Sequence, residues 1–319
     1  MYTPPYTITS KIVNLISQIS EAMTKIEINE AAITPKLRKI SRIKTLAGTL
    51  EIEGNFLGED KITSILEGKR VLGSMREIAE AEGAIAAYGE FENYDYKSLN
   101  DLLKSHKILM GEMLTTAGKF RTVNVGVGGV NGVTHVAPQP HLVPELMQNL
   151  FKWLSATDEH PLISSSVFHY EFEFIHPFSD GNGRVGRLWQ SVMLYSWKNA
   201  FIAIPTESIV RDYQERYYEA LEVSSSVGES TPFIEFMLEV ILKSIQSSVK
   251  DSVKSSVKTE DKIVNYLRQY PQITIPQLAE MLGLSTRAIE KQLAKLKEEG
   301  KVDRVGSARK GEWRVNTNG

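Results

Sequence analysis

Apolar residues recur every three or four positions along most of this chain, which is the period of an amphipathic α-helix. In the segment 9–20, for example, Ile12, Leu15, Ile16 and Ile19 share one face. The same period predicts helices over residues 9–20, 41–53, 60–88 (with a break near Gly68 or Gly73), 98–113, 143–155, 161–174, 188–200, 209–223 and 232–257. The chain is therefore expected to be mainly α-helical.

One segment has a different composition. Residues 120–136 are rich in glycine and β-branched side chains, and they contain the turn signal Asn131-Gly132. Such a composition predicts a β-hairpin. Prolines follow at Pro138, Pro140 and Pro144, and they are expected to prevent the next helix from starting early.

The C-terminal part of the chain has its own pattern. Residues 244–258 are rich in serine and lysine and are expected to form a helical or half-ordered connector to a separate domain. Beyond it the pattern predicts helices at 261–270, 275–282 and 285–298, then strands at 301–305 and 311–315. Ser285 is expected to cap the third helix. Three helices followed by two strands are typical of a winged helix-turn-helix domain.

This C-terminal domain carries cations that could contact DNA phosphates. They are Arg287, Lys291, Lys295 and Lys297 on the third helix, and Arg309 and Lys310 at the wing tip. Acidic neighbours such as Glu290 and Glu298 dilute this charge, and a helix face of mixed charge is most often solvated. Contact with DNA and contact with another protein both remain open.

Composition limits the class of protein. The chain has 319 residues, of which 42% are hydrophobic and 24% charged, as in a soluble globular protein with one large core and a second small domain. It has no apolar run of membrane-spanning length and no signal-peptide pattern, so a cytoplasmic protein without membrane contact is expected. The absence of cysteine excludes disulfides and thiol catalysis. A formal charge of −2 gives no global attraction to nucleic acid.

The densest chemistry lies in residues 174–187, Phe-Ile-His-Pro-Phe-Ser-Asp-Gly-Asn-Gly-Arg-Val-Gly-Arg. His176 is a base with an ordinary pKa near neutrality, and Asp180 is a hard oxygen ligand suited to Mg²⁺. The Gly-Asn-Gly turn can point N–H groups at an anion, and Arg184 and Arg187 share a helix face. An ordinary turn would contain some of these features. Their combination indicates a site that binds a nucleotide and transfers part of it.

The segment resembles the signature of the Fic family, His-Pro-Phe-x-x-Gly-Asn-Gly-Arg-x-x-Arg, and matches it at every defined position. The resemblance implies a helical bundle that transfers AMP from ATP, with Mg²⁺, onto a hydroxyl side chain of a target protein. His176 would deprotonate that hydroxyl, and Asp180 would bind Mg²⁺. The nucleotide would contact Val125, Gly126, Val127, Gly128, Asp180, Gly181, Asn182, Gly183, Arg184, Val185, Gly186, Arg187 and Tyr217.

The resemblance also implies partners. In this family a hairpin flap holds an extended segment of the target protein by strand addition. The target would therefore present its serine, threonine or tyrosine in an extended segment, and self-modification and a homodimer are further expectations. Some relatives have an asparagine where this chain has Ser225, eight positions after Tyr217, so base recognition is expected to differ in detail.

A second motif, Thr-Leu-Glu-Ile-Glu-Gly-Asn, occupies residues 49–55. By itself it is typical of a helix end with a glycine stop. It also resembles the inhibitory motif Ser/Thr-x-x-x-Glu-Gly/Asn of autoinhibited Fic proteins. That resemblance implies a salt bridge from Glu53 to Arg187, which would take the arginine away from the γ-phosphate of ATP. Glu51 would point to the opposite side of the helix.

These observations lead to an expected organisation and to alternatives. The expected regions are an N-terminal helical region (1–95) with an inhibitory helix at about 41–55, a Fic domain (96–243), a connector (244–258) and a winged helix domain (259–319). The alternatives are transfer of another nucleotide or phosphocholine, removal of AMP from a modified target, and a nucleotide-sensing regulator that binds DNA.

Overall fold

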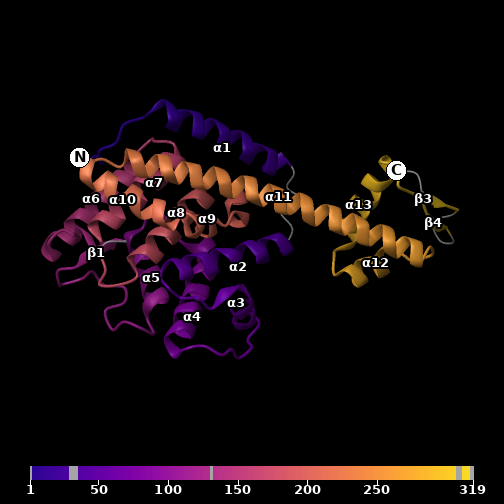
Figure 1. Ribbon diagram of the computed structural model, residues 1–319, viewed down its shortest axis with the longest axis horizontal. Coiled ribbons are helices and arrows are strands. Elements are labelled where there is room, and N and C mark those ends of the chain that lie inside the picture. Colours follow the sequence, from indigo (N-terminus) through magenta and orange to yellow (C-terminus); the bar gives the residue numbers. More distant parts are fainter. Residues whose placement is uncertain (1, 29–34, 130–131, 307–310, 317–319) are drawn as a thin grey trace. The chain divides into compact units, whose positions relative to one another are not determined.

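The computed structural model of the protein describes residues 2–28, 35–129, 132–306 and 311–316. The contacts between residues divide the chain into two compact units, 1–248 and 249–319. Figure 1 shows that helices dominate the first unit. Its helices are α1 (Ser10–Ile28), α2 (Pro35–Ile52), α3 (Gly58–Leu66), α4 (Met75–Gly89), α5 (Leu99–Met110), α6 (Val143–Ala156), α7 (Pro161–Ile175), α8 (Asn182–Trp197), α9 (Thr206–Asp212) and α10 (Gln214–Val227). A hairpin of strands β1 (Gly126–Gly129) and β2 (Gly132–Val136) lies between α5 and α6.

A long helix, α11 (Thr231–Gln269), begins in the first unit and ends in the second. The second unit continues with α12 (Ile275–Leu282), α13 (Thr286–Glu298) and the antiparallel strands β3 (Val302–Val305) and β4 (Glu312–Val315). Thr274 and Ser285 cap α12 and α13 through their hydroxyls, and Gly283 provides the left-handed turn between them. Ile263, Leu278, Ile289, Leu293, Val302 and Trp313 belong to the separate core of this unit.

The mainly helical fold with a C-terminal winged helix is confirmed, and several helix limits differ from the sequence-based prediction. The long segment 60–88 is broken as expected, between α3 and α4. The segment 209–223 forms two helices that separate at Tyr213, where the backbone leaves the helical region. One continuous α11 replaces the two helices predicted at 232–257 and 261–270. The hairpin is shorter than 120–136, because only residues from Gly126 onward pair.

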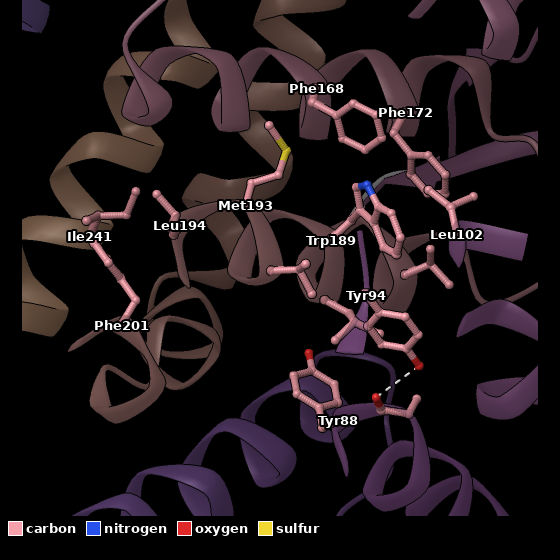
Figure 2. Packing of buried hydrophobic residues seen from close by; sticks show 14 of the residues in the cluster. Tyr88, Tyr94, Leu102, Phe168, Phe172, Trp189, Met193, Leu194, Phe201 and Ile241 are labelled. Atoms are coloured by element: carbon pink, nitrogen blue, oxygen red, sulfur yellow. Dashed lines mark hydrogen bonds between the residues drawn. The ribbon is translucent and has the colours of Figure 1, made fainter. Parts of the chain in front are cut away.

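The core of the first unit gathers around Trp189 of α8. Figure 2 shows its indole beside Phe168 and Phe172 of α7 and Leu102 of α5, and it is fully buried. The indole N–H donates to the carbonyl of Tyr96 at 3.1 Å, so this large ring leaves no buried donor unpaired. Such packing fixes α7 and α8 against each other, and the loop between them lies at the ends of two rigid helices.

Helix α2 is held close to α9. A Cβ at Gly48 would lie 2.6 Å from the backbone nitrogen of Ser208, so only glycine permits this approach. Ser41, two turns before Gly48 in α2, donates to the carbonyl of Ala203 at 2.8 Å. These contacts determine where the C-terminal end of α2 lies. None of the helices in the described part of the chain is long and apolar enough to span a membrane.

Candidate active site

The loop between α7 and α8, residues 176–181, is called the signature loop below. His176 follows α7 in the left-handed conformation (φ 50°, ψ 62°), and Gly181 is also left-handed (φ 84°) before α8 begins at Asn182. The Asn182 side chain closes the loop, since it accepts from the Phe178 N–H at 2.8 Å and donates to the Phe178 carbonyl at 2.9 Å. Because α8 begins at Asn182 and not at 188 as predicted, both arginines of the signature lie in its first two turns.

Phe178 anchors this loop in the core. Its ring is fully buried and stacks on His106 of α5, with ring centroids 3.6 Å apart. His106 accepts from the Gly118 N–H through Nδ1 at 2.8 Å, so its Nε2 carries the proton that is donated to the Asp180 carbonyl at 3.0 Å. Burial lowers the pKa of His106 to about 4, which keeps it neutral. Sequence reasoning missed this role, because nothing in the local sequence links His106 to the signature.

His176 is oriented by its own helix. Its Nδ1 lies 3.3 Å from the carbonyl oxygen of Glu173, and a carbonyl can only accept a hydrogen bond. This contact favours the tautomer that carries its proton on Nδ1, so that Nε2 is left with a lone pair. The side chain is 19% exposed and can therefore be reached from solvent. The geometry suits a general base.

A buried carboxyl group lies beside this histidine. Oε2 of Glu173 is 3.8 Å from Nδ1 of His176, while its Oε1 has no hydrogen-bond partner among the described residues. A Cβ at Gly186 would lie 2.7 Å from that Oε1, so the glycine makes room for the carboxyl. Burial raises the pKa of Glu173 to about 8, and the charge of Arg187 only partly opposes this.

Arg184 is buried with part of its donor capacity unused. Its Nη2 is 3.3 Å from Oδ1 of Asp180, and its Nη1 is 3.7 Å from Oε1 of Glu80 on α4. Nε and Nη1 make no hydrogen bond with the described residues. A buried guanidinium normally uses its donors, so these two are available to an anion.

Arg187, in contrast, is fully engaged by the end of α2. Its Nη2 donates to Oε1 of Glu53 at 2.6 Å, and its Nε donates to Oγ1 of Thr49 at 3.1 Å. Burial acts to raise the pKa of Glu53, yet the charge and hydrogen bond of Arg187 hold that pKa below its ordinary value. The Glu53 charge in turn raises the pKa of Arg187 despite its burial. The pair is therefore ionised, and the contact expected between these two residues exists.

The Glu53 carboxylate also lies at the N-terminal end of α8. A Cβ on Gly183 would be 2.6 Å from its Oε1. The N-terminal end of a helix carries a partial positive charge that attracts anions. The carboxylate thus lies where a phosphate group would be expected. Glu51 points elsewhere, as predicted, and pairs with Arg211 at 2.8 Å.

Residues 53–55, called the α2 turn below, follow the last residue of α2. Gly54 is left-handed (φ 83°), and the Asn55 N–H returns to the Leu50 carbonyl at 3.0 Å. The buried Asn55 amide donates to Oε2 of Glu80 at 2.9 Å and to the Glu77 carbonyl at 3.0 Å. Asn55 therefore attaches the turn that carries Glu53 to α4.

The other residues expected to contact the nucleotide lie near the hairpin and on α10. Val125 precedes β1, which contains Gly126, Val127 and Gly128, and β2 packs against α10. On α10, Tyr217 is fully buried and its hydroxyl is 3.0 Å from Nε2 of His169. The neighbouring Tyr218 is only partly buried, so it is the more accessible ring of the pair. A contact between Tyr217 and a base stays a prediction.

In the described part of the chain, no group of three or more His, Asp or Glu side chains is arranged to hold a metal ion. Asp180 offers a single carboxylate, whose side chain is 46% exposed. One carboxylate suits Mg²⁺ that is held mainly by water and substrate phosphates.

Comparison with known proteins agrees with this geometry. Residues 96–194 match the model of the Fic/DOC family, and residues 258–303 match that of winged helix-turn-helix DNA-binding domains. The Protein adenylyltransferase Fic of Culex quinquefasciatus is 30% identical over 230 residues, which cover 69% of this chain and 44% of that protein. The Protein adenylyltransferase fic-1 of Caenorhabditis elegans is 30% identical over 202 residues, covering 59% and 37%. The chain thus spans less than half the length of these curated relatives.

A solved structure extends the likeness over the full length. The crystal structure of a Fic family protein from Desulfovibrio desulfuricans G20 is 38% identical, with a TM-score of 0.77, and the match covers 100% of this chain and 99% of that one. This chain is therefore a member of the Fic family that carries a C-terminal winged helix-turn-helix domain.

Proposed function

We propose that this protein transfers AMP from ATP to a hydroxyl side chain of a target protein, and that Glu53 inhibits the transfer. The observation that carries the proposal is the grouping, at one end of α8, of a base, a carboxylate and two buried arginines. His176, Asp180, Arg184 and Arg187 all lie within 12 positions of the chain. The names of the similar adenylyltransferases support the same reaction.

In this mechanism the triphosphate lies over the N-terminal end of α8. Arg184, whose Nε and Nη1 make no hydrogen bond with the described residues, contacts the β-phosphate through one edge of its guanidinium, and Arg187 holds the γ-phosphate. Nε2 of His176 takes the proton of the target hydroxyl as its oxygen attacks the α-phosphorus. A new oxygen–phosphorus bond forms, and the bond to the bridging oxygen of the β-phosphate breaks. AMP remains on the target and pyrophosphate leaves.

The exposed Asp180 carboxylate is the residue that would hold Mg²⁺ beside the phosphates. When bound, the ion would neutralise part of the phosphate charge. Asp180 would also release Nη2 of Arg184 on turning toward the ion, since the same carboxylate accepts from that nitrogen.

Inhibition by Glu53 follows from competition for one arginine. The 2.6 Å hydrogen bond to Arg187 uses a donor that the γ-phosphate needs, and the Glu53 carboxylate lies beside Gly183. A charge-assisted hydrogen bond of this kind is strong and specific in a buried setting. ATP would then bind in a pose that does not present the α-phosphorus to the hydroxyl.

The test is the initial rate at which ATP labelled at the α-phosphate labels protein. Glu53→Gly should be faster than the wild type, because Arg187 is released to hold the γ-phosphate. Glu53→Asp, one methylene shorter, should be intermediate. Arg187→Ala should not be activated, because both the inhibitory contact and the phosphate contact are lost. Glu51→Gly is the matched control, since Glu51 pairs with Arg211 and should leave the rate unchanged.

The catalytic assignment is tested in the Glu53→Gly background. His176→Ala should lower the labelling rate by about 10² to 10⁴-fold while ATP still binds, because the base acts on the hydroxyl. The inhibitory assignment is wrong if a folded Glu53→Gly variant binds ATP and labels protein no faster than the wild type.

Removal of AMP from a modified target is the second candidate. The Glu53 carboxylate is 30% exposed and close enough to His176 to affect it electrostatically, so it could orient a water molecule. In that case Glu53→Gly would lose activity on an AMP-modified protein. Binding of ATP with neither reaction would instead favour a nucleotide sensor.

A further inference from the structure

Arg121 lies in the segment predicted to form the hairpin but before its paired strands, and it contacts the signature loop. Its Nε donates to the His176 carbonyl at 2.8 Å, and its Nη2 donates to the Ile175 carbonyl at 3.3 Å. Its backbone N–H donates to the Pro177 carbonyl at 2.9 Å. Three consecutive carbonyls at the end of α7 are thus bonded to one residue.

The same side chain also holds both ends of the hairpin. Nη1 of Arg121 donates to the Val123 carbonyl at 2.9 Å, before β1 begins. Its Nη2 donates to the Pro138 carbonyl at 2.5 Å, after β2 ends. The segments that enter and leave the hairpin are therefore attached to the backbone of the catalytic histidine through one guanidinium.

The chemistry of these contacts is unusual for a buried cation. Arg121 is almost fully buried, and its acceptors among the described residues are all backbone carbonyls. Burial lowers its pKa, and the negative end of the α7 dipole stabilises the charge instead of a carboxylate. Only the planar fork of arginine can reach four carbonyls in such an arrangement, because lysine has one compact ammonium group.

We propose that Arg121 is a positioning residue for the transfer reaction. It holds the hairpin edge, which receives the target segment, at a fixed distance from the imidazole of His176. This inference rests on the proposed function, in which the hairpin binds the target by strand addition. ATP contacts α8 and not Arg121, so the residue affects the placement of the hydroxyl and not the binding of the nucleotide. A displacement of about 1 Å between reacting groups can lower a rate by about a hundredfold.

The experiment compares Arg121→Met and Arg121→Lys in the Glu53→Gly background. Three quantities are measured: the calorimetric dissociation constant of ATP with Mg²⁺, the initial rate of protein labelling from ATP labelled at the α-phosphate, and backbone hydrogen exchange. We expect Arg121→Met to leave ATP affinity within about twofold, to lower labelling by about a hundredfold, and to increase exchange at 122–125, 136–139 and 175–178 together. Arg121→Lys, which keeps the charge, should recover part of the labelling rate and part of the protection from exchange.

Arg216→Met is the control, because Arg216 pairs with Glu239 at 2.9 Å away from the signature loop. Exchange that increases on only one side of Arg121, or on neither, overturns the proposal. So does an equal loss of ATP affinity and labelling in both Arg121 variants, since that would indicate a general role in folding. If Glu53→Gly itself labels no protein, the proposed function fails, while the exchange measurement still tests the connection made by Arg121.

Discussion

At Glu173, a carboxyl group is buried without a hydrogen-bond partner for Oε1 among the described residues, next to the histidine expected to act as base. Sequence reasoning did not select it. The positions that surround it are separated in sequence: His169 lies on the same helix, Arg187 and Gly186 lie on α8, and Glu53 ends α2. Such a group is kept neutral by burial, which has a measurable consequence for stability.

The stability of the protein should fall with rising pH because of Glu173. Its pKa is raised from 4.5 to about 8, so the folded state keeps a proton that the unfolded state loses within that window. This contribution to stability is complete below pH 4.5 and is lost as the pH rises through about 8. The side chain of Glu173→Gln cannot ionise. The melting temperature of the variant minus that of the wild type should therefore become more positive from the acidic to the alkaline end of this window. Melting curves across this window check the prediction, and a parallel shift at all pH values would contradict it.

At the scale of the element, the α2 turn, which carries Glu53, is held by its attachment to α4. Asn55 makes that attachment through the backbone of Glu77 and the side chain of Glu80, and Glu80 also pairs with Arg184. The end of α2 is thus connected to both arginines of the signature, directly through Glu53 and indirectly through Asn55. This second connection could not be inferred from helical periodicity, which identifies a buried face but not its partner.

Asn55→Ala should therefore activate labelling while Glu53 is still present. The variant loses three side-chain hydrogen bonds, including the one that Oδ1 of Asn55 accepts from the Leu57 N–H, each worth about 1 kcal/mol, and the turn is then free to move Glu53 away from Arg187. Ser41→Ala removes one buried hydrogen bond in the first half of α2, away from the turn, and should destabilise the protein without activating it. The initial labelling rates of the two variants distinguish a specific role of Asn55 from a general effect of loosening α2. Activation in both would show that any loosening of α2 is sufficient.

The places of most helices and the short C-terminal elements could be predicted from the sequence, because the apolar period and the caps are local signals, whereas several helix limits could not. The limits of α12 and the Ser285 cap were predicted to the residue. The pair Glu53 with Arg187 came from the family resemblance and not from spacing. Arg121, His106 and Asn55 were missed, because each acts on backbone groups or side chains that are remote in sequence. No local pattern encodes such contacts.

At the scale of the whole molecule, the two units have separate cores. In the second unit, Lys295 pairs with Glu260 at 2.6 Å, and Lys297 lies 5.2 Å from the centre of the Trp313 ring. Two of the cations proposed to contact DNA are thus engaged within the unit. The wing-tip residues Arg309 and Lys310 lie outside the described residues. On α13, Lys295 and Lys297 are therefore less available to a phosphate backbone than Arg287 and Lys291 at the start of the helix.

Removal of residues 259–319 should leave a folded protein that binds ATP and is still activated by Glu53→Gly. The first unit keeps its own core, to which the first part of α11 contributes Ile241 and Ile245. Circular dichroism, ATP titration and labelling of the shortened protein are the measurements. An unfolded product would mean that the two cores depend on each other.

The left-handed backbone of His176 has a consequence for which residues could replace it. It is the one non-glycine residue with positive φ in the described part of the chain, and that conformation costs about 1–2 kcal/mol for most L-residues. Glycine or asparagine would fit it with less strain. Replacing the histidine by one of these residues would therefore relieve the strain. Stabilising changes of this kind at active sites commonly reduce function. His176→Asn is therefore expected to be tolerated by the backbone while removing the imidazole that the proposed transfer requires.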